Sequence, residues 1–193
     1  MQYQDRVIAI DELKGEHFTE ITFEKCRFLG TNLRFSSFTT CVFENCDFTG
    51  VNFEGTSFER CTFPGSKLSN LDFAPVVFIT CDFRTAVIDN SVFQHLRAGT
   101  KGETIRYDIR ECLFSQASLQ NTIFVKCNLE NIDFAEAKLS GALFDRCKLK
   151  KTSYMGADIS GTGFEGSIID QTVLDYQGFV QFGNSRGFVM GNE

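Results

Sequence analysis

Large apolar side chains recur at every fifth position along most of the chain. The phase holds without a miss from Phe18 to Phe93, and it resumes from Ile109 to Leu174. Of the 22 Phe residues, 18 occupy these positions. A period of five fits neither an α-helix nor a flat strand, whose side chains repeat every 3.6 and every two residues. Self-similarity at a short fixed period predicts a repeat solenoid.

A second lattice, of small residues, lies two positions before each large apolar residue. Most of these positions hold Ala, Ser, Thr, Val or Cys, and all 8 Cys lie on them. The exceptions are Glu16, Ile21, Leu71, Tyr107 and Ile132. The pattern predicts that one large and one small side chain point inward in each repeat, while the other three face water. Four such repeats close a square coil, and consecutive coils stack about 4.8 Å apart, the ordinary strand spacing.

The order small residue, Asn or Asp, large apolar residue and two polar residues resembles the pentapeptide repeat proteins. The resemblance covers residues 16–176 apart from one gap. It implies an all-β fold, a right-handed quadrilateral β-helix, and the repeat count gives about 7–8 coils.

Within that family, the chain is most similar to the Qnr-type proteins, which protect bacterial type II topoisomerases from quinolones. Three features carry this similarity: the repeat count, an interruption near the middle of the chain, and a tail that starts at Tyr176-Gln177 and ends in apolar residues. The resemblance implies a dimeric rod that mimics duplex DNA and binds DNA gyrase or topoisomerase IV.

The length fits a single domain over residues 1–193. We expect five segments: an N-terminal cap and incomplete first coil at 1–15, repeats at 16–93, a projecting loop at 94–108, repeats at 109–176, and a C-terminal cap or dimerisation segment at 177–193.

The interruption between Phe93 and Ile109 shifts the phase by one residue, which predicts a loop that projects from the rod. Function in a repeat protein concentrates on outer surfaces and interruptions. The alternative is a solvated insertion without a role. The candidate partner-binding residues of this loop are His95, Leu96, Arg97, Lys101, Glu103, Ile105 and Arg106.

The tail leaves the five-residue phase after Phe179, so its large apolar residues need another partner. They either fold back over the last coil as a cap or join two copies tail to tail, and two-fold dimers are the commonest oligomers. Frequent Gly argues against a long helix but allows a short one around Phe179–Gly183. The candidate residues are Tyr176, Phe179, Phe182, Phe188, Val189 and Met190.

The formal net charge of −6 is modest for a DNA mimic, whose acidic side chains would compete for a surface that normally binds phosphates. Such binding is steered by charge and weakens with salt. Ordinary surface charge for solubility is the alternative, and a module that binds some other protein through the loop and tail is the alternative function. The candidate acidic residues are Glu16, Glu20, Glu24, Glu44, Glu54, Glu59, Asp72 and Asp82.

Catalysis, cofactor binding and metal binding have no support in the sequence. The chain has 2 His, and no nucleophile–base pair, phosphate-binding Gly motif or metal-ligand spacing is present. We therefore expect no catalytic residue, metal, cofactor or small-molecule substrate, and the acidic balance disfavours direct nucleic-acid binding.

The cysteines and the N-terminus both favour a cytoplasmic protein. Cys41, Cys61 and Cys81 would stack one coil apart, within disulfide range. We nevertheless expect reduced structural thiols, because each replaces a small residue and no C-x-x-C motif occurs. The first residues form no apolar signal segment and no apolar run is long enough to span a membrane.

Overall fold

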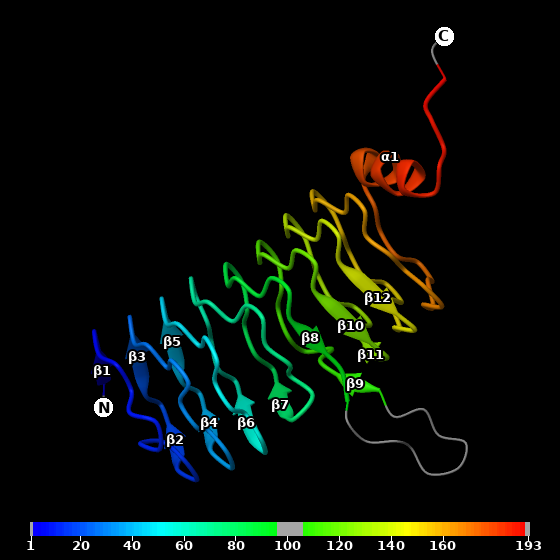
Figure 1. Ribbon diagram of the computed structural model, residues 1–193. Helices are drawn as coiled ribbons and strands as arrows, with labels where there is room; N and C mark the ends of the chain where they lie inside the picture. The colour runs from blue at the N-terminus through cyan, green and yellow to red at the C-terminus, as the bar shows by residue number, and fades with distance from the viewer. Residues whose placement is uncertain (1, 96–105, 192–193) are drawn as a thin grey trace, which may run out of the picture.

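The chain forms a rod of stacked square coils with one helix at its C-terminal end (Figure 1). This computed structural model describes residues 2–95 and 106–191. The elements are β1 (Gln2–Gln4), β2 (His17–Thr19), β3 (Thr22–Glu24), β4 (Ser37–Thr39), β5 (Val42–Glu44), β6 (Thr56–Glu59), β7 (Val76–Ile79), β8 (Val92–Phe93), β9 (Tyr107–Asp108), β10 (Ile123–Val125), β11 (Cys127–Asn128), β12 (Leu143–Asp145) and α1 (Tyr176–Ser185).

All strand pairs are parallel, and each joins one coil to the next. Phe23 pairs with Phe43, and across the interruption Asp82 pairs with Leu113. The predicted β-helix of about 7–8 coils is therefore confirmed.

The coils have four faces, and each repeat runs from two residues before its inward-pointing apolar residue to two residues after it. Face 1 carries Tyr3, Phe23, Phe43, Phe63, Phe83, Phe114, Phe134, Tyr154 and Leu174. Face 2 carries Ile8, Phe28, Phe48, Leu68, Ile88, Leu119, Leu139 and Ile159. Face 3 carries Leu13, Leu33, Phe53, Phe73, Phe93, Phe124, Phe144 and Phe164. Face 4 carries Phe18, Phe38, Phe58, Phe78, Ile109, Leu129, Leu149 and Ile169.

Burial along these four columns is complete except at the ends of the rod. Tyr3, Phe18 and Leu174 are only partly buried, and Ile169 at the end of face 4 is exposed. Each of these side chains lies in a terminal coil, where one of the two neighbouring layers is missing.

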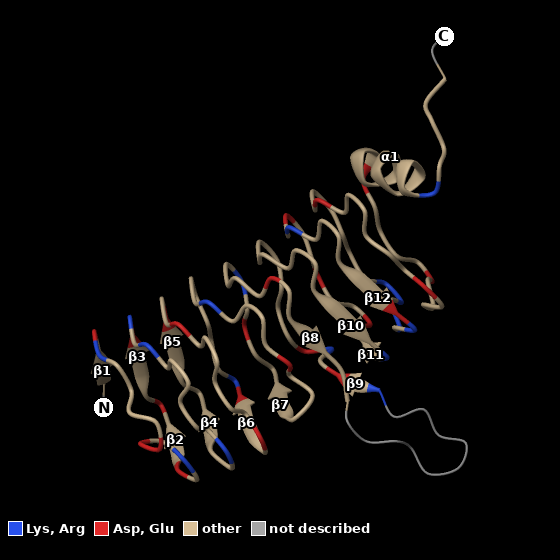
Figure 2. Ribbon diagram, viewed as in Figure 1, with Lys and Arg blue, Asp and Glu red and all other residues tan. Residues whose placement is uncertain are grey.

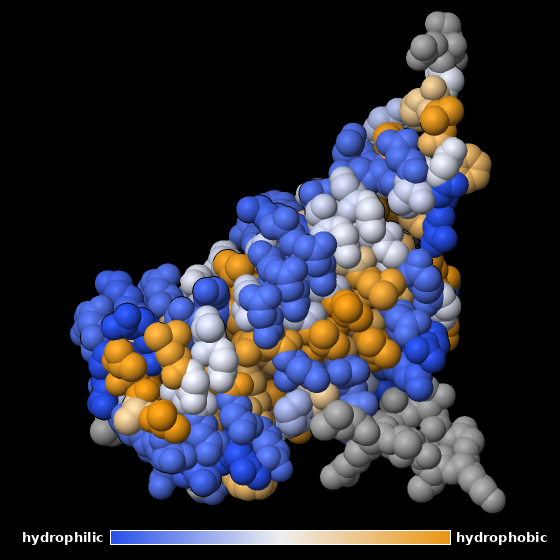
Figure 3. Space-filling view, in the orientation of Figure 1, coloured by the Kyte–Doolittle hydropathy of each residue, from blue (hydrophilic) through white to orange (hydrophobic). Residues whose placement is uncertain are grey.

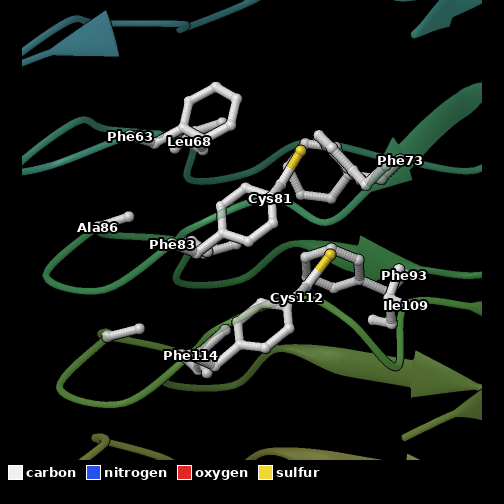
Figure 4. Packing of buried hydrophobic residues seen from close by; sticks show 14 of the residues in the cluster. Phe63, Leu68, Phe73, Cys81, Phe83, Ala86, Phe93, Ile109, Cys112 and Phe114 are labelled. Carbon is white, nitrogen blue, oxygen red and sulfur yellow. The ribbon is translucent and has the colours of Figure 1, made fainter. Parts of the chain in front are cut away.

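Stacked aromatic rings fill the interior along the rod axis. The ring centroids of Phe28 and Phe48 lie 4.6 Å apart with 2° between the planes, and those of Phe23 and Phe43 lie 4.9 Å apart. Rings from adjacent faces meet edge to face, as Phe38 and Phe43 do at 5.4 Å and 74°. Figure 4 shows the same layering around Phe83 and Phe114. Each such pair contributes about 0.5–1.5 kcal/mol beyond the area it buries.

The small-residue lattice has a hydrogen-bonding role as well as a steric one. Ser66 Oγ donates to the Phe43 carbonyl at 2.6 Å, and Thr56 Oγ1 donates to the Leu33 carbonyl at 2.7 Å. Cys46 Sγ approaches the Phe23 carbonyl at 3.3 Å in the same way. Ser, Thr and Cys therefore fit these buried positions because the preceding coil satisfies their polar groups. All eight Cys are buried and unbridged.

The corners between faces require left-handed backbone. Asn90, Asn121 and Gly141, the last residues of three face 2 repeats, have φ of 58°, 55° and 70°. Gly and Asn are the residues that adopt this conformation most readily, so their recurrence at the corners follows from the backbone.

Residues 2–15 lie in the first coil of the rod. Tyr3 stacks on Phe23 at 4.8 Å, and Ile8 and Leu13 are 2% and 1% exposed. Their side chains continue the five-residue phase, so residues 2–15 supply the first three sides of a coil that Phe18 completes.

The interruption ends earlier than expected. Tyr107 and Asp108, which we assigned to the projecting loop, form β9 and pair with Cys127 and Asn128 of β11. The repeat around Ile109 includes the two residues before it, and these residues pair with the next coil and so belong to the β-helix rather than to the loop.

Candidate interaction surfaces

The acidic residues selected from the sequence do not share one surface. Glu24, Glu44 and Asp82 lie on face 1, whereas the others lie on faces 3 and 4. The face 3 residues are Glu54 and Asp72, and the face 4 residues are Glu16, Glu20 and Glu59. Four of the eight carboxylates form ion pairs: Glu24 with Lys25, Glu54 with Arg34, Glu59 with Arg60, and Asp82 with Arg84.

Negative charge is concentrated on face 1. Its repeats carry seven acidic and two basic side chains. The repeats of face 2 carry three acidic and four basic side chains, and those of face 3 carry six acidic and four basic ones. The repeats of face 4 carry seven acidic and five basic side chains. Face 1 thus has a net charge of −5, against +1, −2 and −2 on the other faces. Figure 2 shows where the charged residues lie along the coils. The bases of face 1 are Lys25 and Arg84, and its acids are Asp5, Glu24, Glu44, Asp82, Asp133, Glu136 and Asp175.

Four of these acids were absent from the sequence-based selection: Asp5, Asp133, Glu136 and Asp175. All but Asp5 lie beyond the interruption, across which the offset between stacked coils is 31 residues instead of 20. The sequence could have placed these acids on face 1 if the repeats had been counted in groups of four and the inserted residues left out of the count.

Two carboxylates of face 1 are held in the ionised form. Burial alone would raise the pKa of Asp82, but hydrogen bonds from Arg84 lower it below its usual value. The pKa of Asp175 is lowered by hydrogen bonds from the backbone N–H groups of Gly178 and Gly156. Both side chains therefore carry negative charge at neutral pH.

The candidate loop lies mostly outside the described residues, which include only His95 and Arg106 of its seven candidates. Leu96, Arg97, Lys101, Glu103 and Ile105 all fall in the segment that the structure does not describe. Arg106 donates from Nη1 to the Arg146 carbonyl at 2.6 Å, and the His95 ring lies 6.2 Å from the Tyr107 ring. His95 thus ends a repeat of face 3, and Arg106 directly precedes a repeat of face 4.

The tail divides into a capping part and an exposed part. Helix α1 begins after Asp175, whose side chain accepts a hydrogen bond from Gly178 N–H at 2.7 Å. Phe182 packs against Phe164 with ring centroids 5.9 Å apart, and Gln181 Oε1 accepts from Ile159 N–H at 3.0 Å. These contacts place the helix over the last coil.

The remaining apolar residues of the tail face away from the rod. The exposed fraction is 73% for Tyr176, 61% for Phe179, 72% for Phe188, 88% for Val189 and 64% for Met190. Together with Val180, they line a hollow of about 250 Å³. After α1 the chain extends away from the rod (Figure 1), so this apolar surface has no cover within the described chain.

Two kinds of site are absent from residues 2–95 and 106–191. They contain no group of three or more His, Cys, Asp or Glu side chains that could hold a metal ion. Nor do these residues include a helix with the length and apolar composition needed to cross a membrane.

The comparisons with known proteins agree with this architecture. The model of the pentapeptide repeat region matches residues 16–93 and 107–174. The chain belongs to the pentapeptide repeat family. The two matched segments are separated by the interruption described above, and no curated protein matches the chain.

Solved structures of QnrB1, described as a plasmid-mediated fluoroquinolone resistance protein, share the fold of this chain. A trypsin-treated form has 17% sequence identity and a TM-score of 0.58, with 99% of each chain covered. Full-length QnrB1 has 18% identity and a TM-score of 0.58, covering 95% of this chain and 96% of its own. HetL from the cyanobacterium Nostoc sp. strain PCC 7120 has 14% identity and a TM-score of 0.47, covering 89% and 84%. At these identities the likeness to QnrB1 shows the fold alone.

Proposed function

We propose that this pentapeptide repeat protein is a non-enzymatic DNA mimic that binds a type II topoisomerase, DNA gyrase or topoisomerase IV, and protects it from quinolones. The observation that carries the proposal is the concentration of charge on face 1, with a net value of −5. A line of carboxylates on a rigid rod can compete with phosphates for a basic groove. QnrB1, whose fold this chain shares, is described as a fluoroquinolone resistance protein, and that description agrees with the proposal.

The exposed apolar tail supports a homodimer as the active form. Phe179 and Val189 lie on the side of the tail that does not contact the last coil. A second copy would bury this surface, and a two-fold contact joins identical patches. The resulting dimer would be a longer rod with an acidic face in each half.

The test is DNA supercoiling by purified gyrase, with and without ciprofloxacin, while this protein is titrated in. Rescue of supercoiling in the presence of the drug is the expected result. Inhibition without rescue would identify a DNA-mimic inhibitor, and no effect would favour a different protein partner, the alternative function.

A pair of matched variants tests the role of face 1. Changing Glu24, Glu44 and Glu136 to Gln removes three charges from face 1, whereas changing Glu20, Glu59 and Glu165 to Gln removes three from faces 3 and 4. We expect the first variant to lose most of its effect on gyrase and the second to keep it. Equal effects of both variants would refute the assignment to face 1.

A further inference from the structure

Tyr107 occupies a position that small residues hold in every other coil of face 4 except the first, which has Glu16 there. The equivalent positions in the neighbouring coils are Thr56, Val76 and Cys127. Tyr107 is 5% exposed, and its hydroxyl donates to the Val76 carbonyl at 2.8 Å and approaches the Phe73 carbonyl at 3.3 Å. A phenol ring therefore lies between two coils of face 4, at a position where the neighbouring coils have only a small side chain.

The phenol replaces a backbone hydrogen bond of the ladder. On the same face, the Ser36 carbonyl accepts the Ser57 N–H at 3.1 Å, and the Cys127 carbonyl accepts the Lys148 N–H at 2.9 Å. The corresponding acceptor at the interruption is the Val76 carbonyl, which receives the Tyr107 hydroxyl instead. In the described parts of the chain, no backbone hydrogen bond joins β7 to β9.

The result is a split in face 4 with a strand edge on either side. Strand β7 ends the four-stranded sheet β2-β4-β6-β7, and β9 ends the two-stranded sheet with β11. Thr40 and Arg60 donate their N–H groups to the next coil at 2.8 Å. Thr80 follows them in the stack, so its N–H points toward the split. An open strand edge is a template for pairing with another extended chain.

The two ends of the split differ in chemistry. At the start of β7, a hollow of about 520 Å³ is lined mainly by apolar surface, including Ala74, Pro75, Val76 and Val77, and we call it the apolar hollow. The polar side chains His95, Arg106 and Asp108 also line it. At the end of β7, the acidic hollow of about 500 Å³ is lined by Ile79 and Thr80, by the carboxylates of Asp108, Glu111 and Glu130, and by Arg110.

Charge and apolarity together specify what fits there. The acidic hollow holds three carboxylates and one guanidinium, and that guanidinium is paired with Asp108 at 2.7 Å. Glu130 is paired with Lys148 at 2.5 Å. Glu111 forms no ion pair within the described chain and accepts the Thr80 hydroxyl at 2.8 Å across the split, so it is the carboxylate that an incoming Lys or Arg would meet.

Val77 and Ile79, on the outside of β7, are 52% and 47% exposed. An apolar side chain on an added strand would pack against these exposed apolar residues, and such cross-strand pairs stabilise a sheet. Figure 3 shows further apolar surface nearby, over β8, β10 and β12.

We propose that the split between β7 and β9 binds an extended segment of a partner protein by strand addition to β7, with apolar side chains at the apolar hollow and Lys or Arg at the acidic hollow. Main-chain hydrogen bonds along β7 give affinity, and the two hollows give direction and specificity. This site lies on face 4 and does not depend on the proposed binding of a topoisomerase by face 1.

The test uses a fluorescent synthetic peptide that alternates Val with Thr in its first half and Lys with Thr in its second half. Binding to the full chain is followed by fluorescence anisotropy. Two control peptides are used: one has Glu in place of Lys, and one is N-methylated at alternate peptide bonds. We expect saturable binding of the first peptide, with each control weaker by at least about tenfold.

The variant Glu111→Lys inverts one charge of the acidic hollow, and Glu136→Lys on face 1 is its matched control. We expect Glu111→Lys to weaken binding of the Lys peptide by about tenfold and to strengthen binding of the Glu peptide, while Glu136→Lys leaves both unchanged. A second variant, Tyr107→Thr, restores the small residue type found at Thr56 and should abolish peptide binding with the rod still folded by circular dichroism.

Three outcomes would overturn the proposal. The first is no saturable binding to the full chain, and the second is full binding of the N-methylated peptide, which would exclude strand addition. The third is binding only after residues 96–105 are deleted, which would assign the split to the chain's own segment.

Discussion

The hydroxyl of Tyr154 offers a sharp test of how this core is stabilised. Tyr154 is 0% exposed and stacks on Phe134 with ring centroids 5.3 Å apart and 10° between the planes. Its ring occupies a place in the face 1 column that Phe114 and Phe134 fill in the preceding coils. No hydrogen-bond partner for its hydroxyl exists among the described residues, and burial raises its pKa well above the usual value.

Changing Tyr154 to Phe removes that hydroxyl and keeps the ring contacts. An unpaired buried polar group costs about 1–3 kcal/mol, so we expect the free energy of unfolding to rise by about that amount. For a chain of this length, that gain raises the midpoint of thermal unfolding by about 2–12 °C. Tyr107→Phe is the matched control, because the Tyr107 hydroxyl donates to the Val76 carbonyl. Its loss should lower the free energy of unfolding by about 1–3 kcal/mol.

The assay is urea unfolding followed by circular dichroism, with the slope of the transition compared across wild type and both variants. Equal slopes show that differences in midpoint report stability. A midpoint for Tyr154→Phe at or below that of wild type would refute the reasoning. So would a Tyr107→Phe variant that is as stable as wild type.

Other features of the rod lead to further expected outcomes. Phe43→Ala removes a fully buried ring that stacks between Phe23 and Phe63, and urea unfolding should show a loss of about 3–5 kcal/mol. Burial raises the pKa of Cys46 to about 12, so a thiol reagent at neutral pH should modify it only after unfolding, and rapid labelling of the native protein would contradict this. The lowered pKa of Asp175 means that its carboxylate stabilises the fold above its unfolded pKa of about 3.9, and that this stability is lost as the pH falls through the lower folded value. Asp175→Asn should therefore reduce the acid sensitivity of thermal unfolding, and an unchanged pH profile would argue against it. If the proposed dimer forms through the tail, Phe179→Asp should convert it into a monomer in sedimentation analysis, whereas Glu165→Gln should not.

The five-residue spacing by itself determined the fold. Because each repeat buries one large and one small side chain, the spacing of the apolar residues determines where the chain turns each corner and that four repeats form one coil. The stacking of Phe23 on Phe43 then follows from chain geometry. The same local rule predicted buried, unbridged thiols at positions such as Cys46. Ring stacking and thiol burial both depend on residues one coil away, and the fixed five-residue period determines which residues those are.

The surfaces were harder to predict, because they depend on which coils become neighbours after the interruption. The changed offset places Asp133 and Glu136 on the same face as Glu24 and Glu44, and that face carries most of the net charge. Likewise, the sequence could not show that α1 would bury Phe182 against Phe164 and leave Phe179 exposed. Helix orientation is decided by packing on the last coil rather than by local spacing.

The split in face 4 required the tertiary structure most of all. The sequence marked Tyr107 as an exception on the small-residue lattice, where a large side chain overfills a closely packed interior. Only the structure showed the outcome, in which the hydroxyl takes the Val76 carbonyl and β7 and β9 end separate sheets. Sequence spacing determined where each side chain points, but the packing of coil on coil decided which strand edges, charges and apolar side chains remain available to a partner.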